Sequence, residues 1–253
     1  GAVYVPRRNE VVTFGRVVRV WTPGVQGPLS THEFPQYVRD VDVTPDGKVT
    51  VALLDGEARV FATRTGRPSL SAPIESTISP QFAISDSGRF LATHEGTRGT
   101  AIWSVATGRN VATLPTVGDD IRGMAFTPSE KRLVVRTTHR DQALHVWDIA
   151  NEERLLTVQG GGPFASTERG LVRVVWARIS ATDAQLEVRR VGSTAPVSVI
   201  APLRRPFRGD IDDYVDIDSS GRYVTLRDEV PETGEAILKV YAAETGELLA
   251  TRP

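Results

Sequence analysis

The chain has 253 residues, of which 40% are hydrophobic and 24% charged, and its formal net charge at pH 7 is −1. This composition is typical of a folded chain with a sizeable core, and it excludes wholesale disorder. The near-neutral charge lacks the basic signature of a nucleic-acid-binding protein. No apolar run approaches the roughly 18 residues that a membrane span needs. Cysteine is absent, which excludes disulfides, thiol catalysis and cysteine-based zinc sites.

In chain order, six similar segments each read as two short strands joined by a tight polar turn. Apolar–polar alternation on both sides of turns rich in Gly, Asn or Thr is the usual signal of a β-hairpin. The segments begin at residues 17, 57, 100, 144, 186 and 238. One equivalent position in these segments, called the aromatic slot, is occupied by Trp21, Phe61, Trp103, Trp147, Arg189 and Tyr241.

A second signature, a short strand ending in a turn, precedes these hairpins. It reads VDVTPDG at residue 41, FAISDSG at 82, MAFTPSE at 124, FASTERG at 164 and VDIDSSG at 215, with a degraded copy, VYVPRRN, at 3. The equivalent turn positions are Pro6, Pro45, Asp86, Pro128, Glu168 and Ser219, which lie 39, 41, 42, 40 and 51 residues apart. Each repeat therefore predicts four strands.

Four short strands at a period of about 40 to 45 residues are the sequence sign of a β-propeller blade. Packing blades side by side buries sheet faces that a lone blade would expose. We predict an all-β chain forming a single β-propeller domain of about six four-stranded blades. The predicted units are residues 1–33, 34–76, 77–116, 117–160, 161–203 and 204–253. The alternative is a seven-bladed ring with a blade or closing strand missing, because the chain starts at an expected innermost strand and stops at an outermost one.

The repeats resemble the WD-repeat family over nearly the whole chain. Trp147–Asp148 is a true Trp-Asp pair, and His32 stands in the place of the family's loop histidine. The resemblance implies structural roles for His32, for Trp21, Trp103 and Trp147, and for Asp55, Asp141 and Asp183, which lie six residues before the aromatic slot. Gly, Thr and Glu replace that aspartate at 15, 97 and 235. The resemblance is therefore to a divergent, bacterial-style member.

Two aspartates stand at an inner-strand position that other repeats fill with Val or Ala. They are Asp42 and Asp216. An unpaired buried charge is very costly. We therefore expect these carboxylates either to line the water-filled central channel of the propeller or to be paired with another group. With Arg39 and Arg122 they are the predicted polar contacts of a site at the channel mouth.

The motifs give little support to metal binding or catalysis. His145 stands at a strand position that other repeats fill with Arg, Glu or Lys, which predicts a solvated side chain. The segment from Asp216 to Gly221 imitates half of a calcium loop, but Arg227 stands where that loop needs Glu. Phosphate-loop, nucleophile-elbow and dinucleotide motifs are missing from the sequence. We expect no metal, no cofactor and no enzymatic activity.

The link between the fifth and sixth repeats is longer than the other links. Loops on rigid scaffolds gather binding residues, and Arg and aromatic side chains are favoured in interface hot spots. The candidate partner contacts in this link are Arg204, Arg205, Phe207, Arg208, Asp210, Asp212 and Asp213. The alternative is a solvated loop in which these arginines and aspartates pair with one another.

The resemblance implies a non-catalytic module that binds a protein or peptide partner, as sensor or scaffold in a larger bacterial signalling protein. This step is an analogy from fold, which does not fix function. One alternative is a small-molecule sensor that binds at the channel mouth, and a propeller enzyme ranks last. We expect a cytoplasmic chain with no nucleic-acid partner and no membrane span, fused to or associated with other domains.

Overall fold

The computed structural model describes residues 1–74, 81–115, 121–137, 143–159, 162–167, 170–178, 184–191, 193, 195–203, 214–218, 221–229 and 235–252. These residues form β-strands and two single-turn 3-10 helices, η1 (Pro6–Arg8) and η2 (Gly96–Arg98). The chain divides into two compact units, Gly1–Thr157 and Val158–Pro253.

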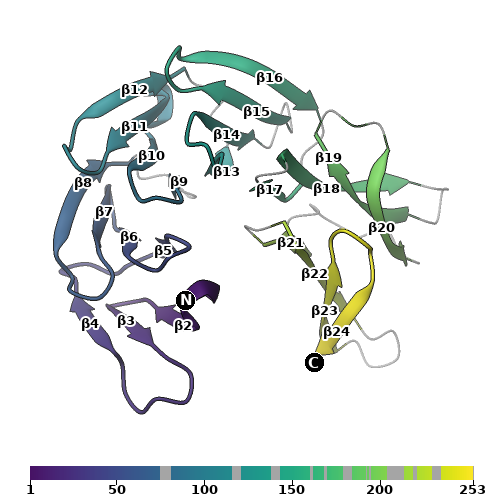
Figure 1. The fold of residues 1–253 in the computed structure, drawn as a ribbon, viewed down its shortest axis with the longest axis horizontal. Helices are drawn as coiled ribbons and strands as arrows, with labels where there is room; N and C mark the ends of the chain where they lie inside the picture. The colour runs from purple at the N-terminus through teal and green to yellow at the C-terminus, as the bar shows by residue number, and fades with distance from the viewer. Residues whose placement is uncertain are drawn as a thin grey trace. The chain divides into compact units, whose positions relative to one another are not determined.

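The first unit consists of four antiparallel sheets of four strands, called blades 1 to 4 (Figure 1). Blade 1 contains β1 (Ala2–Val5), β2 (Glu10–Thr13), β3 (Val17–Trp21) and β4 (Ser30–Glu33). Blade 2 contains β5 (Asp40–Val43), β6 (Val49–Leu53), β7 (Glu57–Ala62) and β8 (Pro68–Pro73). Blade 3 contains β9 (Phe82–Ile84), β10 (Phe90–His94), β11 (Thr100–Ser104) and β12 (Asn110–Leu114). Blade 4 contains β13 (Ile121–Phe126), β14 (Arg132–Thr137), β15 (Ala143–Asp148) and β16 (Glu153–Gln159).

The second unit contains two further sheets of the same kind, blades 5 and 6. Blade 5 contains β17 (Phe164–Thr167), β18 (Gly170–Arg178), β19 (Ala184–Arg190) and β20 (Pro196–Leu203). Blade 6 contains β21 (Val215–Ile217), β22 (Tyr223–Glu229), β23 (Ala236–Ala242) and β24 (Leu248–Arg252). The predicted fold class, all-β with six four-stranded propeller blades, is confirmed. The residue boundaries proposed for the units stay a prediction.

The core lies between neighbouring blades rather than within any one of them. Side chains alternate between the two faces of a strand, so within each unit a blade packs an apolar face against the next blade. Blades 1 and 2 share a buried cluster that includes Val12, Val20, Val41 and Phe61. In the second unit, Val174 and Leu186 of blade 5 pack with Val224 and Leu226 of blade 6.

The turn between the first and second strands has the same geometry in blades 2, 3, 4 and 6. Its fourth residue donates a backbone N–H to the carbonyl of the first at 2.7–2.8 Å, in the pairs Gly47–Thr44, Gly88–Ser85, Glu130–Thr127 and Gly221–Asp218. The donors have φ between 58° and 72°, a left-handed conformation that glycine adopts without steric cost. The side-chain oxygen of the first residue also accepts an N–H from the start of the second strand. The signature seen in the sequence is this turn.

Trp21 and Trp103 each use their indole N–H inside their own blade. Trp21 donates to Thr13 Oγ1 at 2.8 Å and Trp103 to Thr93 Oγ1 at 2.9 Å. Each threonine lies two residues beyond the strand partner of its tryptophan. In blade 4 the same slot is Val135, and among the described residues the indole N–H of Trp147 has no hydrogen-bond partner. The blades therefore share the aromatic slot without sharing its hydrogen bond.

Thr93→Val keeps the shape of the side chain and removes only the acceptor for the Trp103 indole. Removing the acceptor leaves the indole N–H shielded from water and without a hydrogen bond. We therefore expect the free energy of unfolding to fall by about 1 kcal/mol. Urea denaturation followed by tryptophan fluorescence measures the change. Val135→Thr is the reciprocal variant, which supplies an acceptor to Trp147. An equal loss of stability in Val135→Thr would contradict the role given to this slot.

Candidate functional site

The inner strand of blade 2 carries two carboxylates on one side. Asp40 and Asp42 in β5 are two residues apart, so they share a face of the strand. Asp42 is half-buried, and its Oδ1 accepts the Val43 N–H at 2.8 Å. Its Oδ2 accepts the Ile84 N–H from β9 of blade 3 at 3.4 Å. Asp42 therefore lies at the joint between two blades.

This surrounding changes the acidity of both groups. Burial raises the pKa of Asp42 to about 6, against the hydrogen bonds from Ile84 and Val43 and with a further rise from the charges of Asp40 and Asp86. Burial also raises the pKa of Asp40, against a hydrogen bond from Val41 and the positive amino terminus. Asp42 therefore ionises at about pH 6, well above the usual range of an aspartate.

The other three residues predicted for a channel site each have contacts of their own. Arg39 pairs with Asp55 at the surface, with 3.1 Å between Nη2 and Oδ1. Arg122 is exposed in β13, and its backbone carbonyl accepts Arg136 Nη2 at 3.5 Å. Asp216 lies in the second unit, where it is exposed and accepts the Ile217 N–H at 2.8 Å. A shared channel site stays a prediction.

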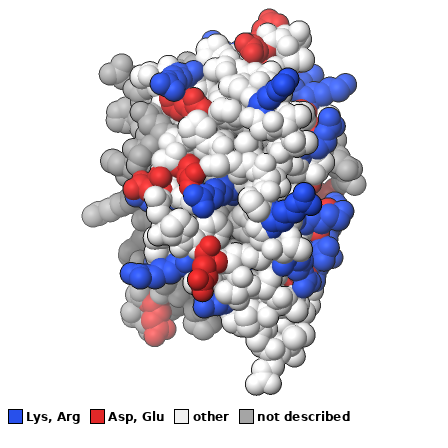
Figure 2. Space-filling model, turned by 90° about the vertical axis from the view of Figure 1, so that its left-hand side faces the viewer, with Lys and Arg blue, Asp and Glu red and all other residues white. Residues whose placement is uncertain are grey.

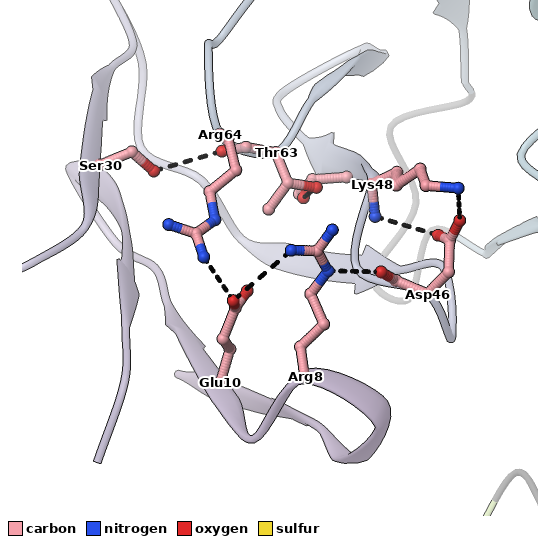
Figure 3. Close-up of polar contacts among 8 residues, drawn as sticks. Arg8, Glu10, Ser30, Asp46, Lys48, Thr63 and Arg64 are labelled. Atoms are coloured by element: carbon pink, nitrogen blue, oxygen red, sulfur yellow. Dashed lines mark hydrogen bonds and ion pairs between the residues drawn. The ribbon is translucent and has the colours of Figure 1, made fainter. Parts of the chain in front are cut away.

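A polar cluster that the sequence did not reveal joins blade 1 to blade 2 (Figure 3). Glu10, at the start of β2, is only 3% exposed. Its Oε1 accepts Arg64 Nη2 from the turn after β7 at 2.6 Å, and Arg8 Nη1 lies 3.9 Å away. Arg8 also donates from Nε to the Asp46 carbonyl at 2.7 Å. One buried carboxylate and two guanidinium groups thus connect the two sheets.

A second contact between the same blades involves His32. The residue lies within strand β4, which corrects the predicted loop position. Its Nε2 is 2.7 Å from the Thr63 carbonyl oxygen of blade 2. The same oxygen accepts a hydrogen bond from Ser30 Oγ at 3.2 Å (Figure 3). The His32 ring meets Phe61 edge-on at 5.4 Å between ring centroids. A Cβ on Gly66 would come within 2.5 Å of His32 Nδ1, so this close approach requires glycine.

His145 contradicts its prediction. The residue is 2% exposed, so the expected solvated side chain is wrong. Its Nδ1 lies 3.1 Å from Thr157 Oγ1 and its Nε2 lies 3.4 Å from Thr137 Oγ1. These hydroxyl groups, on the strands at either side, let a polar ring occupy a buried position. The alternation of polar and apolar residues along β15 could not predict these partners, because the hydroxyl groups belong to the neighbouring strands β14 and β16.

Several predicted residues lie outside the described residues. They are Asp141 and Asp183, and all the candidate partner contacts, Arg204, Arg205, Phe207, Arg208, Asp210, Asp212 and Asp213.

Two features are absent from the described part of the chain. No group of three or more His, Cys, Asp or Glu side chains there is placed to hold a metal ion. No helix in that part is long and apolar enough to cross a membrane.

The blades define the class of protein, an all-β chain built from propeller blades. No protein-family model matches the chain. A protein described as an uncharacterized WD repeat-containing protein from Deinococcus radiodurans is 32% identical to it over 124 residues. The match covers 44% of this chain and 43% of that protein, so it spans less than half of either. The blades and this partial similarity are together consistent with a divergent, WD-repeat-like β-propeller.

Arg64→Met keeps much of the aliphatic stem and removes the closest charge to Glu10. A buried carboxylate that loses its partner is strongly destabilising, although Arg8 remains nearby, and we expect the free energy of unfolding to fall by about 2 kcal/mol. Urea denaturation at pH 7 measures the loss. The matched control is Lys48→Met, because the exposed Lys48–Asp46 pair should contribute at most about 0.5 kcal/mol. Equal losses would rule out a special role for Glu10.

Asp42→Asn tests the raised pKa. Between pH 4 and pH 6 the folded wild type keeps a proton on Asp42 that the unfolded chain has lost. The stability that this proton provides is therefore present at low pH and lost as pH rises through about 6. Because Asn does not titrate, we expect the variant to gain about 2–3 kcal/mol relative to the wild type between pH 4 and pH 8. Urea denaturation at both pH values measures this, and a pH-independent difference would contradict the assignment.

Proposed function

We propose that the chain is a non-catalytic interaction module that binds a protein or peptide partner. The observation that carries this proposal is the fixed position of the turns, which contact the neighbouring blade. Examples are the hydrogen bonds from Arg8 to the Asp46 carbonyl and from the Ser87 N–H to Glu130 Oε1, the latter at 3.0 Å. Turns held in this way lose little conformational entropy on binding. The similarity to a WD repeat-containing protein supports the same reading, because such propellers commonly mediate protein interactions and are generally non-enzymatic.

We assign the main partner contact to the segment 204–213. Arg204, Arg205 and Phe207 combine planar hydrogen-bond donors with an aromatic anchor, the residue types enriched in hot spots. The same proposal places the chain in the cytoplasm, as the sensor or scaffold part of a larger bacterial signalling protein.

The proposal is tested by affinity capture from a lysate of the source organism, with quantitative mass spectrometry. The test variant is Arg204→Ala/Arg205→Ala/Phe207→Ala. The matched control is Arg16→Ala/Arg19→Ala/Tyr37→Ala, which removes two exposed arginines and an exposed aromatic ring from blade 1 and the loop after it. We expect one specific protein to be retained by the wild type and the control and to fall at least tenfold with the test variant. Equal retention by both variants would disprove the assigned contact.

A second candidate function is a small-molecule sensor, favoured by the half-buried Asp42 carboxyl group at the joint of blades 2 and 3. A carboxyl group that ionises near pH 6 can bind a polar ligand by hydrogen bond or by charge. Absence of any retained protein in the capture experiment would favour this candidate. A thermal-shift screen of metabolites would then be informative, because a ligand of the native state raises apparent stability.

A further inference from the structure

The turns of blades 1 to 4 form one continuous surface, which we call the turn face. In an antiparallel four-stranded sheet, the first and third turns lie at the same end. Adjacent blades also touch there, since Arg8 reaches the Asp46 carbonyl and the Ser87 N–H reaches Glu130. We restrict the turn face to seven of these eight turns, residues 6–9, 44–48, 63–67, 85–89, 105–109, 127–132 and 149–154, all of which the structure describes; the eighth, residues 22–29 of blade 1, contains no charged residue.

The turn face is basic, although the chain as a whole is not. Its seven segments contain ten Lys and Arg and five Asp and Glu. The described loops at the other end of these blades, residues 14–16, 34–39, 54–56 and 95–99, contain three basic and two acidic residues. In Figure 2 the Lys and Arg side chains are densest along the right-hand margin, with others over the rest of this view, whereas Asp and Glu are scattered. Among the described turns and loops of blades 1 to 4, the positive charge is therefore concentrated on the turn face.

The cations occupy a repeated position. Seven turns of this face contain a residue with left-handed φ, and a basic residue follows it in five of them, at Lys48, Arg67, Arg89, Arg109 and Lys131. Backbone hydrogen bonds close these turns, such as Gly66 N–H to the Ala62 carbonyl and Gly108 N–H to the Ser104 carbonyl, both at 2.8 Å. The basic side chains thus extend from equivalent positions in turns whose backbone is held by hydrogen bonds.

Three of these cations are available to a partner. Arg67, Arg109 and Lys131 are exposed, and the described part of the chain shows no side-chain hydrogen bond or ion pair for them. In contrast, Lys48 pairs with Asp46 at 2.9 Å and Arg64 with Glu10 at 2.6 Å. A partner that contacts Arg67, Arg109 and Lys131 therefore breaks no internal ion pair.

We propose that the turn face docks an acidic segment of a protein partner. Asp46, Glu130 and Glu153 lie among the cations and would repel a uniform polyanion such as nucleic acid or an anionic membrane. A polypeptide can place its carboxylates against the cations alone. The inference rests on the proposed interaction function, and it adds the partner's chemistry and a surface made of residues other than 204–213.

The test measures fluorescence polarisation of a labelled twelve-residue Glu/Gly peptide, with a Gln/Gly peptide as the neutral probe. We expect the full chain to bind the acidic peptide, and binding to weaken as salt rises because exposed charges are screened. The variant Arg67→Glu/Arg109→Glu/Lys131→Glu should weaken binding at least tenfold. The control Arg16→Glu/Arg19→Glu/Arg98→Glu makes the same change in net charge away from the turn face and should alter binding less than twofold. Arg67→Lys/Arg109→Lys should retain binding, which separates loss of charge from loss of fold.

Three outcomes would overturn the inference: no binding of the acidic peptide, an equal loss in both charge-reversal variants, or tighter binding of a twenty-base-pair DNA duplex or of phosphatidylserine vesicles. The 204–213 triple variant tells the two proposals apart. If it keeps peptide binding and loses the lysate partner, both proposals are supported. If the lysate partner is captured and the peptide does not bind the wild type, only the inference about the turn face fails.

Discussion

Every blade has two apolar faces and can cover neither by itself, and the rest of the structure depends on this constraint. Val12 and Val20 are completely buried only because blade 2 lies against them, and Val224 and Leu226 only because blade 5 does. Burying such a side chain contributes about 1.5–3 kcal/mol, so each joint between blades is worth more than any single turn or ion pair. Each blade is therefore stable only when its apolar face is buried against a neighbouring blade.

Polar contacts complete the edges of these apolar joints. Glu10 meets Arg64 at the joint of blades 1 and 2, and Asp42 meets the Ile84 N–H at the joint of blades 2 and 3. The hydroxyl of Ser30 reaches the Thr63 carbonyl in the first unit, and Ser198 reaches the Ala243 carbonyl at 2.6 Å in the second. Because buried polar groups are costly without partners, these contacts favour one particular approach of each pair of sheets.

Much of this architecture could be predicted from the sequence, because a period of about 40 residues and Gly-closed turns are local signals. Gly47, Gly88 and Gly221 mark the turns, and the aromatic slot marks the third strand. Contacts between blades could not be predicted in the same way, because their partners are far apart in sequence. Glu10 and Arg64 are 54 residues apart, and nothing near Glu10 announces a buried carboxylate. The prediction for His145 failed for the same reason, since its hydroxyl partners lie on neighbouring strands.

Glu130 has a further consequence for the modularity of the repeat. It adopts the left-handed conformation that its counterparts leave to glycine, and its carboxylate holds the Ser87 N–H of blade 3. Each joint of the first unit thus has its own polar signature, with Glu10 in one, Asp42 in the next and Glu130 in the third. The apolar faces are alike from blade to blade, whereas these polar contacts differ at each joint. Replacing blade 2 by another blade would therefore remove Arg64 and leave the buried Glu10 carboxylate without its closest partner.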